Sequence, residues 1–475
     1  MSFSRRKFLT IAGVSAASVT MVSPLEAFYT RVARGQAVRS TGFGRLEPKL
    51  PLNAPELTNT YVGDLSQKPL LELPPGFNYR AFSITGQTMS DGSLVPERHD
   101  GMAAFPGSRN TTILVRNHEA GTSSPYPVSG SPRYSAGAQG GTTTLVIGPN
   151  REVIKDFASL AGTIRNCAGG PTPWGSWISC EETFSVSTNV LKDDTKHGYN
   201  FEVIANPNSG LVTPVPLKDM GRFSHEAIAV DPKTGYVYET EDRTDSCFYR
   251  FVPNVKGELA EGGTLYALKV KGTENFALNT TNNPNFGGQI EKIKVGQTFD
   301  VEWVKIDNPD PEQESIQNRL GVRYEAQSKG AAIFFRGEGA WYGNGVIYFV
   351  ATQAGAPAVD ATNGRGNGQV WIYDPRKEKL TLYVEADSSG ELLDEPDNVT
   401  VTPFGDIFLC EDGGGVQYVV GVNKQGELYQ FAKNVISDAE FAGGCFSPDG
   451  RTFFVNIYNP GITCAIWGPW ERHRS

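Results

Sequence analysis

The sequence contains no run of Lys and Arg, no long uninterrupted apolar stretch and little helical periodicity outside its N-terminus. Proteins that track nucleic acid phosphates usually carry a basic patch, whereas the net charge here is −9. A membrane-spanning helix needs about 20 consecutive apolar residues, and a mainly helical fold needs a 3.6-residue apolar period. We therefore expect no specific nucleic acid partner and no stable membrane span. The excess of acidic residues suits metal binding.

The sequence is instead rich in short strand patterns separated by turns. Its 53 Gly and 30 Pro residues follow no fixed period and are interspersed with Tyr, Phe, Val, Thr and Ile. This composition is typical of many short strands joined by turns. A chain of 475 residues is long enough for two or three average domains, but all-β repeat folds often run longer as one unit. We predict an all-β fold with a single domain over residues 38–475.

The N-terminus carries an export pattern. Ser4-Arg5-Arg6-Lys7-Phe8-Leu9 precedes a weakly apolar stretch from Ile11 to about Phe28, which is interrupted by Pro24. This order indicates a twin-arginine signal, because the apolar part is too short and too polar to span a bilayer. We predict a signal peptide over residues 1–37, recognised by the twin-arginine export machinery, and a periplasmic or secreted protein. This route carries folded proteins, often with a cofactor already inserted.

One pattern occurs six times: an acidic or thiol residue, a glycine turn, and a short apolar strand that ends in polar or acidic residues. The clearest copies run from Glu226 to Glu241-Asp242 and from Asp397 to Glu411-Asp412. Looser copies begin at Asp100, Cys167, Glu338 and Glu440. Repeats of this size with strand signals predict blades arranged around an axis. The long gap between the copies at 226 and 338 has loop composition and predicts a loop-rich insertion at about 255–335.

Each repeat is expected to form a hairpin that brings its first acid and its last acids to the same end of a blade. The centre would then be a basin of carboxylates, which suits hard cations such as calcium. Cys167 occupies a position that acids fill in other copies, and a thiolate shifts the metal preference towards iron or zinc. An exported protein with six cysteines could form three disulfides. We expect Cys180, Cys410 and Cys445 to be buried thiols, since they lie in apolar strand patterns.

Several motifs, in order, resemble those of the PhoX-type alkaline phosphatases, and the resemblance extends from about residue 70 to 470. They are His99-Asp100-Gly101, Arg116-Asn117-His118-Glu119, Asn166-Cys167-Ala168-Gly169-Gly170, Gly221-Arg222-Phe223-Ser224-His225-Glu226, Thr240-Glu241-Asp242-Arg243, Pro396-Asp397-Asn398, Cys410-Glu411-Asp412 and Phe446-Ser447-Pro448-Asp449-Gly450. The resemblance implies a six-bladed β-propeller whose central pocket holds calcium ions and an iron centre with one Cys thiolate ligand. It also implies hydrolysis of phosphate monoesters outside the cytoplasm, and we expect a monomer.

Carried over by motif, the thiolate ligand is Cys167. The carboxylate ligands would come from the acids of the repeated motifs: Glu119, Glu181, Glu182, Glu226, Glu241, Asp242, Glu338, Asp397, Glu411 and Asp412. We expect His118 and His225 to orient the glutamates that follow them rather than to bind metal, because calcium prefers oxygen ligands.

Arg336 is similar to the phosphate-holding arginine of the family, and Asn117 to its polar partner. A phosphate monoester is a dianion, and the planar guanidinium group can pair with two of its oxygens. The family pattern Arg-Pro-Glu-Gly is replaced here by Arg336-Gly337-Glu338-Gly339, and the glycine at 337 gives the backbone beside Arg336 more freedom. A phosphate-binding lysine has no clear counterpart in the sequence.

Two other functions fit the same carboxylate basin. One is a calcium-dependent propeller hydrolase of another ester, such as a lactone or a phosphotriester, whose activity would survive the loss of Cys167. The other is a non-catalytic binding propeller in which metal ions only raise stability. Cys167 favours the phosphatase, because a structural calcium site has no use for a thiolate.

Overall fold

A computed structural model of the chain describes residues 42–184, 188–273, 278–287, 291–359, 361 and 363–471. The predicted signal peptide at residues 1–37 lies outside these ranges. Within them, no helix has the length and apolarity that a membrane crossing requires. Regular structure is almost entirely antiparallel β-sheet, as the turn-rich, β-branched sequence predicts.

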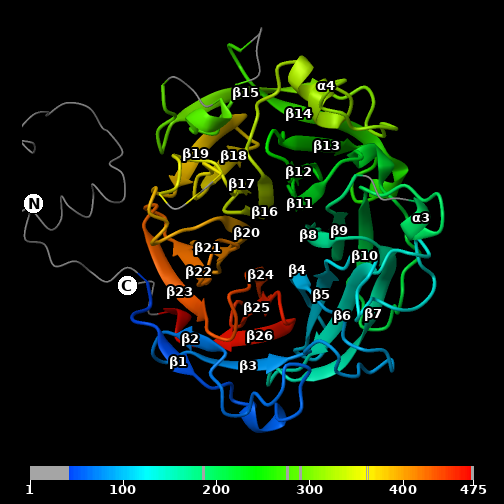
Figure 1. The fold of residues 1–475 in the computed structure, drawn as a ribbon, viewed down its shortest axis with the longest axis vertical. Helices are drawn as coiled ribbons and strands as arrows, with labels where there is room; N and C mark the ends of the chain where they lie inside the picture. Colours follow the sequence, from blue (N-terminus) through cyan, green and yellow to red (C-terminus); the bar gives the residue numbers. More distant parts are fainter. Residues whose placement is uncertain are drawn as a thin grey trace, which may run out of the picture. The chain divides into compact units, whose positions relative to one another are not determined.

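The strands form five hydrogen-bonded sheets arranged like the blades of a propeller (Figure 1). Three of the sheets contain three or four strands, in this order: β4 (His99–Pro106), β5 (Thr112–His118), β6 (Gly140–Ile147) and β7 (Val153–Thr163); β8 (Asn166–Pro171), β9 (Ser176–Glu181) and β10 (Asn200–Ile204); β24 (Phe441–Phe446), β25 (Phe453–Ile457), β26 (Ile462–Trp467) and β3 (Asn78–Phe82).

The two larger sheets contain nine and six strands. The nine-stranded sheet runs in the order β11 (His225–Val230), β12 (Val237–Glu241), β13 (Tyr249–Pro253), β14 (Gly263–Val270), β15 (Thr298–Lys305), β19 (Lys379–Glu385), β18 (Gln369–Asp374), β17 (Val346–Ala351) and β16 (Gly337–Gly343). The six-stranded sheet runs in the order β1 (Glu47–Lys49), β2 (Leu71–Leu73), β23 (Leu428–Asn434), β22 (Tyr418–Val422), β21 (Ile407–Glu411) and β20 (Pro396–Val401).

Helices are few and short in the described ranges. They are α3 (Thr188–Leu191), α4 (Val322–Ser328) and four 3₁₀ turns: η1 (Ala54–Glu56), η2 (Lys218–Met220), η3 (Leu259–Glu261) and η4 (Pro284–Phe286).

The sequence predicts six separate blades, and the five hydrogen-bonded sheets differ from that expectation because β15 joins two strand stacks. On one edge β15 pairs with β14, placing Tyr266 opposite Lys305. On the other edge it pairs with β19, placing Phe299 opposite Leu380. The segment at 255–335, expected to be a loop-rich insertion, thus contributes both β14 and β15 to the nine-stranded sheet.

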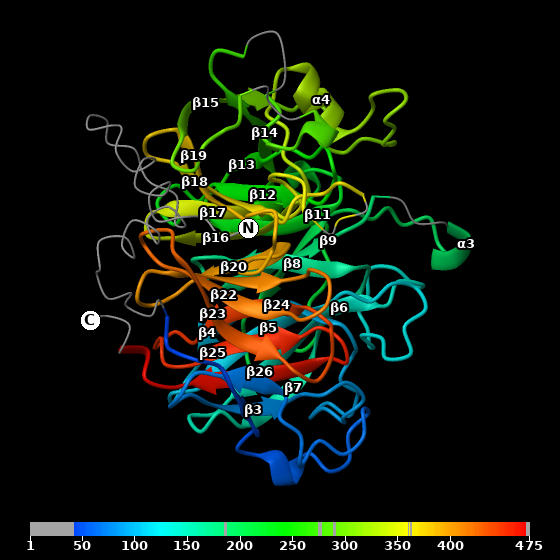
Figure 2. The ribbon, with the colours of Figure 1, turned by 60° about the vertical axis from the view of Figure 1, so that its left-hand side comes forward.

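The centre is lined by one edge strand from each stack. Neighbouring inner strands contact one another in a closed series, β4, β8, β11, β16, β20, β24 and back to β4, and Figure 2 shows the same strands turned by 60°. Glycine permits this close approach. A Cβ atom added at Gly101 of β4 would lie 2.6 Å from Cα of Ala168 on β8, and one at Gly339 of β16 would lie 2.6 Å from the carbonyl oxygen of Asp397 on β20.

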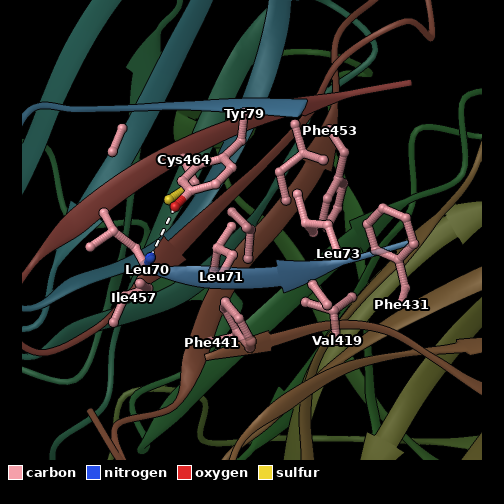
Figure 3. Close-up of a cluster of buried hydrophobic side chains, with 14 of the residues drawn as sticks. Leu70, Leu71, Leu73, Tyr79, Val419, Phe431, Phe441, Phe453, Ile457 and Cys464 are labelled. Atoms are coloured by element: carbon pink, nitrogen blue, oxygen red, sulfur yellow. Dashed lines mark hydrogen bonds between the residues drawn. The ribbon is translucent and has the colours of Figure 1, made fainter. Parts of the chain in front are cut away.

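The N-terminal part of the described chain closes the structure against its C-terminal sheets. Strand β3 pairs with β26, and β2 pairs with β23. Figure 3 shows the apolar cluster beneath them, in which Leu71 and Leu73 meet Phe431 and Phe453. The hydroxyl of Tyr79 accepts a hydrogen bond from the Leu70 amide at 3.0 Å in the same cluster. This apolar seam holds the two ends of the described chain together.

Candidate metal centre

Five of the six inner strands carry a metal-ligating residue type at their second position. These residues are Asp100, Cys167, Glu226, Glu338 and Asp397. In each strand the register with its neighbour shifts at this point, for example between His225 and Ile228 on β11 and between Pro396 and Val399 on β20. A β-bulge leaves a residue outside the hydrogen-bonded ladder and redirects its side chain. The same bulge in each strand therefore presents the ligating group at the centre.

A second set of acids follows the end of the neighbouring strand in four of the stacks: Glu119, Glu182, Asp242 and Asp412. Each is fixed through its backbone, because its N–H donates a hydrogen bond to the carbonyl of the residue before the inner strand, as Glu182 does to Arg165 at 2.9 Å. Thr352 and Tyr458 hold the equivalent places in the other two stacks. These acids are less buried than Glu226 and Glu338, so they lie nearer the mouth of the centre.

Two groups of three carboxylates lie close enough to share a metal ion. In each group the oxygen atoms lie within 4.8 Å of one another: Glu226, Glu338 and Asp397 in one, and Asp397, Asp412 and Glu440 in the other. Asp397 belongs to both. Carboxylates do not gather at this density without a strong repulsive cost unless protons or cations neutralise them.

Burial and mutual repulsion raise the carboxyl pKa values throughout the centre. The pKa of Asp397 rises to about 7, chiefly through burial and then through the charge of Asp412. The pKa of Glu182 rises to about 8, through burial and then through Asp242. Burial also raises the pKa values of Glu226 and Glu338 well above the usual range, with the neighbouring acids adding to it. Such values are typical of a site built to hold positive charge.

The thiol of Cys167 is buried next to this centre and interacts electrostatically with Glu226, Glu182 and Asp100, although it belongs to neither carboxylate triad. Its Sγ atom lies 3.4 Å from the carbonyl oxygen of His225, and the residue is 5% exposed. Burial raises the pKa of the thiol, and the carboxylates of Glu226 and Glu182 raise it further. A thiol in these surroundings becomes a thiolate only beside a cation. The donor set of buried carboxylates with one thiol therefore fits a metal centre with both hard and soft character.

Three acids of the predicted ligand set lie inside the blades instead of at the centre. The carboxylate of Glu181 accepts hydrogen bonds from the Gly198 amide at 2.8 Å and from the Ile164 amide at 3.0 Å. That of Glu411 accepts from the amides of Asp394 and Tyr418, both at 2.9 Å. Glu241 is the third. All three are the last residue of a strand, and the residue after each faces the centre, because successive side chains alternate in direction.

Arg336 stands between two of the central acids. Its Nε and Nη2 atoms donate to the two carboxylate oxygens of Asp242 at 2.8 and 2.9 Å, and Nη2 also lies 2.8 Å from Oε1 of Glu338. Its backbone is in the left-handed region, with φ of 55°, which is uncommon for a residue with a side chain. This conformation, followed by Gly337, directs the guanidinium group over the carboxylates.

Asn117 is buried beside the bulge that contains Cys167, and both polar atoms of its side chain form hydrogen bonds with other protein groups. Its Nδ2 atom donates to the carbonyls of Cys167 and Ala168 at 3.1 and 2.6 Å. Its Oδ1 atom accepts from Trp177 and Ser179, both at 2.9 Å. The residue is fully buried. This geometry makes Asn117 a support for the Cys167 bulge.

His118 and His225, which directly precede the central acids Glu119 and Glu226, form hydrogen bonds with backbone carbonyls inside the blades. Nδ1 of His118 lies 2.9 Å from the carbonyl oxygen of Glu97, and Nε2 of His225 lies 3.0 Å from that of Gly221. Both rings are fully buried. They fix the strand positions from which Glu119 and Glu226 project.

Two acids of the centre were absent from the predicted ligand set, Asp100 and Glu440. Burial and then the charge of Glu119 raise the pKa of Asp100, and burial and then Asp412 raise that of Glu440. Both residues begin copies of the repeated pattern, so the repeat indicates that they are candidate ligands. Glu440 differs from the others because it precedes its inner strand, β24, whose second residue is Ala442.

Comparison with known proteins identifies the family. The family described as alkaline phosphatase PhoX matches residues 61–461. No curated protein sequence matches the chain. Among solved structures, PhoX from Pseudomonas fluorescens, in complex with the transition-state analogue vanadate, superposes with a TM-score of 0.64 and 18% identity, covering 84% of this chain and 96% of that one.

Other solved structures are more distant. A gluconolactonase from Xanthomonas campestris has a TM-score of 0.39 and 12% identity, over 91% of this chain and all (100%) of that one. The virginiamycin B lyase of Staphylococcus aureus has a TM-score of 0.38 and 11% identity, over 82% and 99%. The family match spans most of the chain and includes every residue of the centre, and the chain therefore belongs to the PhoX family of alkaline phosphatases.

Proposed function

We propose that this phosphatase hydrolyses phosphate monoesters at the centre of the inner strands, with calcium and iron held by the carboxylates and by Cys167. One observation carries the proposal: two carboxylate triads that share Asp397 lie beside Arg336, which pairs with Asp242 and Glu338. A cation-binding cluster and a guanidinium group side by side supply what a phosphate dianion needs, namely neutralised oxygens and a fixed orientation.

The acids are proposed as ligands according to their position. The ligand set consists of the groups directed at the centre: Asp100, Glu119, Cys167, Glu182, Glu226, Asp242, Glu338, Asp397, Asp412 and Glu440. Glu181, Glu241 and Glu411 are omitted, because hydrogen bonds inside the blades engage their carboxylates. Oxygen donors suit calcium, and the thiolate suits iron. Bound cations would neutralise charge on the phosphoryl oxygens and hold the attacking oxygen in line.

Arg336 is proposed to bind the phosphoryl oxygens of the substrate. Its side chain is 25% exposed, so it is accessible from the mouth of the centre. Asp242 and Glu338 hold the guanidinium group in place and keep it oriented before substrate arrives, which lowers the cost of ordering it. Asn117 is proposed to act through Cys167, by fixing the two carbonyls of the bulge.

The architecture is proposed to be a six-bladed propeller. Each of the six inner strands is the innermost strand of its own blade. The nine-stranded sheet then comprises two blades joined by β15. The proposed domain spans residues 38–475, with the segment at about 255–335 elaborating the third blade. The Ser4-Arg5-Arg6 motif supports residues 1–37 as a twin-arginine signal and the protein as periplasmic or secreted. A monomer is proposed for the protein.

The test of the site is a comparison of two arginine variants in turnover of a chromogenic phosphate monoester. Arg336→Met should lower kcat/KM by roughly 100-fold or more, the usual effect of removing a donor aimed at the transition state. Arg376→Met is the matched control, because Arg376 is an exposed arginine that pairs with Asp374 in the turn between β18 and β19. Equal activity of the Arg336 variant and the control would contradict the assignment.

A further inference from the structure

Arg165 holds the same backbone position as Arg336 in another blade. Each directly precedes an inner strand, β8 for Arg165 and β16 for Arg336. Each is left-handed, with φ of 49° and 55°. Each carbonyl accepts a hydrogen bond at 2.9 Å from the residue that follows the neighbouring strand, Glu182 or Thr352. Arg98, directly before β4, shares this backbone position, with φ of 53° and a carbonyl that accepts a hydrogen bond from the Glu119 amide at 3.1 Å. Its Nη1 atom donates to the Tyr458 hydroxyl at 3.2 Å, whereas Arg165 and Arg336 both pair with carboxylates at the mouth of the centre.

Arg165 also pairs with central carboxylates as Arg336 does. Its Nε atom lies 3.2 Å from Oε1 of Glu119, and its Nη2 atom lies 2.5 Å from Oε2 of Glu182. Glu182 in turn interacts with Asp242, the carboxylate that Arg336 holds with two hydrogen bonds. The two arginines thus flank the Glu182–Asp242 pair, and each charged side chain interacts with the next in the order Arg165, Glu182, Asp242, Arg336.

Both guanidinium groups retain unused donors. Among the described residues, no acceptor pairs with Nη1 of Arg165 or with Nη1 of Arg336. Arg323, the arginine beside Glu241, differs, because its Nε, Nη1 and Nη2 atoms are all engaged and its side chain is only 7% exposed. The side chain of Arg165 is 48% exposed. An exposed guanidinium group with free donors above a site for anionic substrate is suited to bind an anion.

We propose that Arg165 is a second anion-binding residue of this centre, which together with Arg336 receives the phosphate group from the opposite side of the Glu182–Asp242 pair. The inference rests on the proposed function and deepens it. Two guanidinium groups on one phosphate favour the doubly charged monoester group over singly charged diesters, because the added attraction scales with the ligand charge.

The test is equilibrium binding of inorganic phosphate to the metal-loaded protein, measured by calorimetry, with metal content determined in parallel. Arg165→Met should raise the Kd for phosphate by roughly tenfold or more, the effect of losing one charge-assisted contact. Arg165→Lys should recover part of the loss, because the charge remains without the planar fork. The control variant Arg376→Met removes an exposed arginine outside the centre. It should bind phosphate as the unmodified protein does.

A role only as counter-ion to Glu119 and Glu182 gives a different result. Removing a positive charge next to metal ligands strengthens metal binding, so Arg165→Met would then change the metal affinity and leave the phosphate Kd unchanged, which would overturn the proposal. Turnover by the unmodified protein separates this outcome from failure of the proposed function. If the unmodified protein is active and Arg165→Met has an unchanged phosphate Kd, only the proposed role of Arg165 is refuted. Arg165-dependent phosphate binding without turnover supports Arg165 and refutes the phosphatase assignment of the site.

Discussion

Glu241 and Asp242 are adjacent in the chain, yet their carboxylates serve different parts of the protein. Glu241 accepts hydrogen bonds from the Tyr249 hydroxyl at 2.7 Å and from Nη1 of Arg323 at 3.0 Å, inside the blade. Asp242 accepts two hydrogen bonds from Arg336 at the centre. The alternation of side chains at the end of β12 directs one acid into the blade and the next towards the centre.

This pair can be separated by substitution. Glu241→Gln should lower the free energy of unfolding by about 1–3 kcal/mol, because a buried ion pair loses its charge while Arg323 stays buried, and metal content should be unchanged. Asp242→Asn should lower metal content without lowering the stability of the metal-free protein, since it removes one of several mutually repelling carboxylates. Denaturant titration and elemental analysis of both variants provide the comparison. Similar behaviour of the two variants would contradict the division of roles.

Cys167 should determine which metal is retained. Cys167→Ala should abolish iron retention and leave a folded protein that still binds calcium, because only the soft ligand is lost. Cys445→Ala is the control, since Cys445 is a buried thiol in an apolar cluster and should cost stability without changing metal content. Iron and calcium are quantified in each purified variant. Iron retained by the Cys167 variant would refute its assignment as a ligand.

The raised carboxyl pKa values predict how pH acts on the metal-free protein. The pKa of Asp412 is raised to about 6, that of Asp397 to about 7 and that of Glu182 to about 8, whereas unfolded carboxyl groups titrate near about 4. Between about pH 4 and 8 the folded protein holds more protons than the unfolded chain, so its stability falls as pH rises through this window.

Metal ions compete with those protons, so the stabilisation by metal should grow over the same pH range. Thermal unfolding with chelator and with added calcium at pH 5 and pH 8 tests this. The metal-free Tm should be lower at pH 8, and calcium should raise Tm more at pH 8 than at pH 5. An equal calcium effect at both pH values would show that the carboxylates of the centre do not bind the ion.

Much of the centre could be predicted from the repeated pattern. The position of Cys167 among acids and the recurrence of Glu226, Glu338 and Asp397 follow from a metal-ligating side chain, either a carboxylate or a thiol, placed before each glycine turn. The bulge that turns these side chains inward occurs at the same place in five of the six inner strands, so the repeated sequence pattern coincides with a repeated backbone geometry there.

The remaining features depend on details that the repeat does not specify. Which acid of a Glu-Asp pair faces the centre depends on the residue at which the strand ends, and an uncertainty of one residue reverses the direction. Glu440 reaches the centre from before its strand, in a blade whose second residue is Ala442. The pairing of β15 with β19 joins residues far apart in sequence, and local patterns carry no information about such contacts.

The most direct test of the central claim is hydrolysis of a chromogenic phosphate monoester at alkaline pH by the purified protein with its native metals, with and without a calcium chelator. We predict turnover that the chelator abolishes and that added calcium restores. Absence of turnover from protein shown to contain iron and calcium, or turnover unaffected by the chelator, would contradict a metal-dependent phosphatase centre built from these carboxylates.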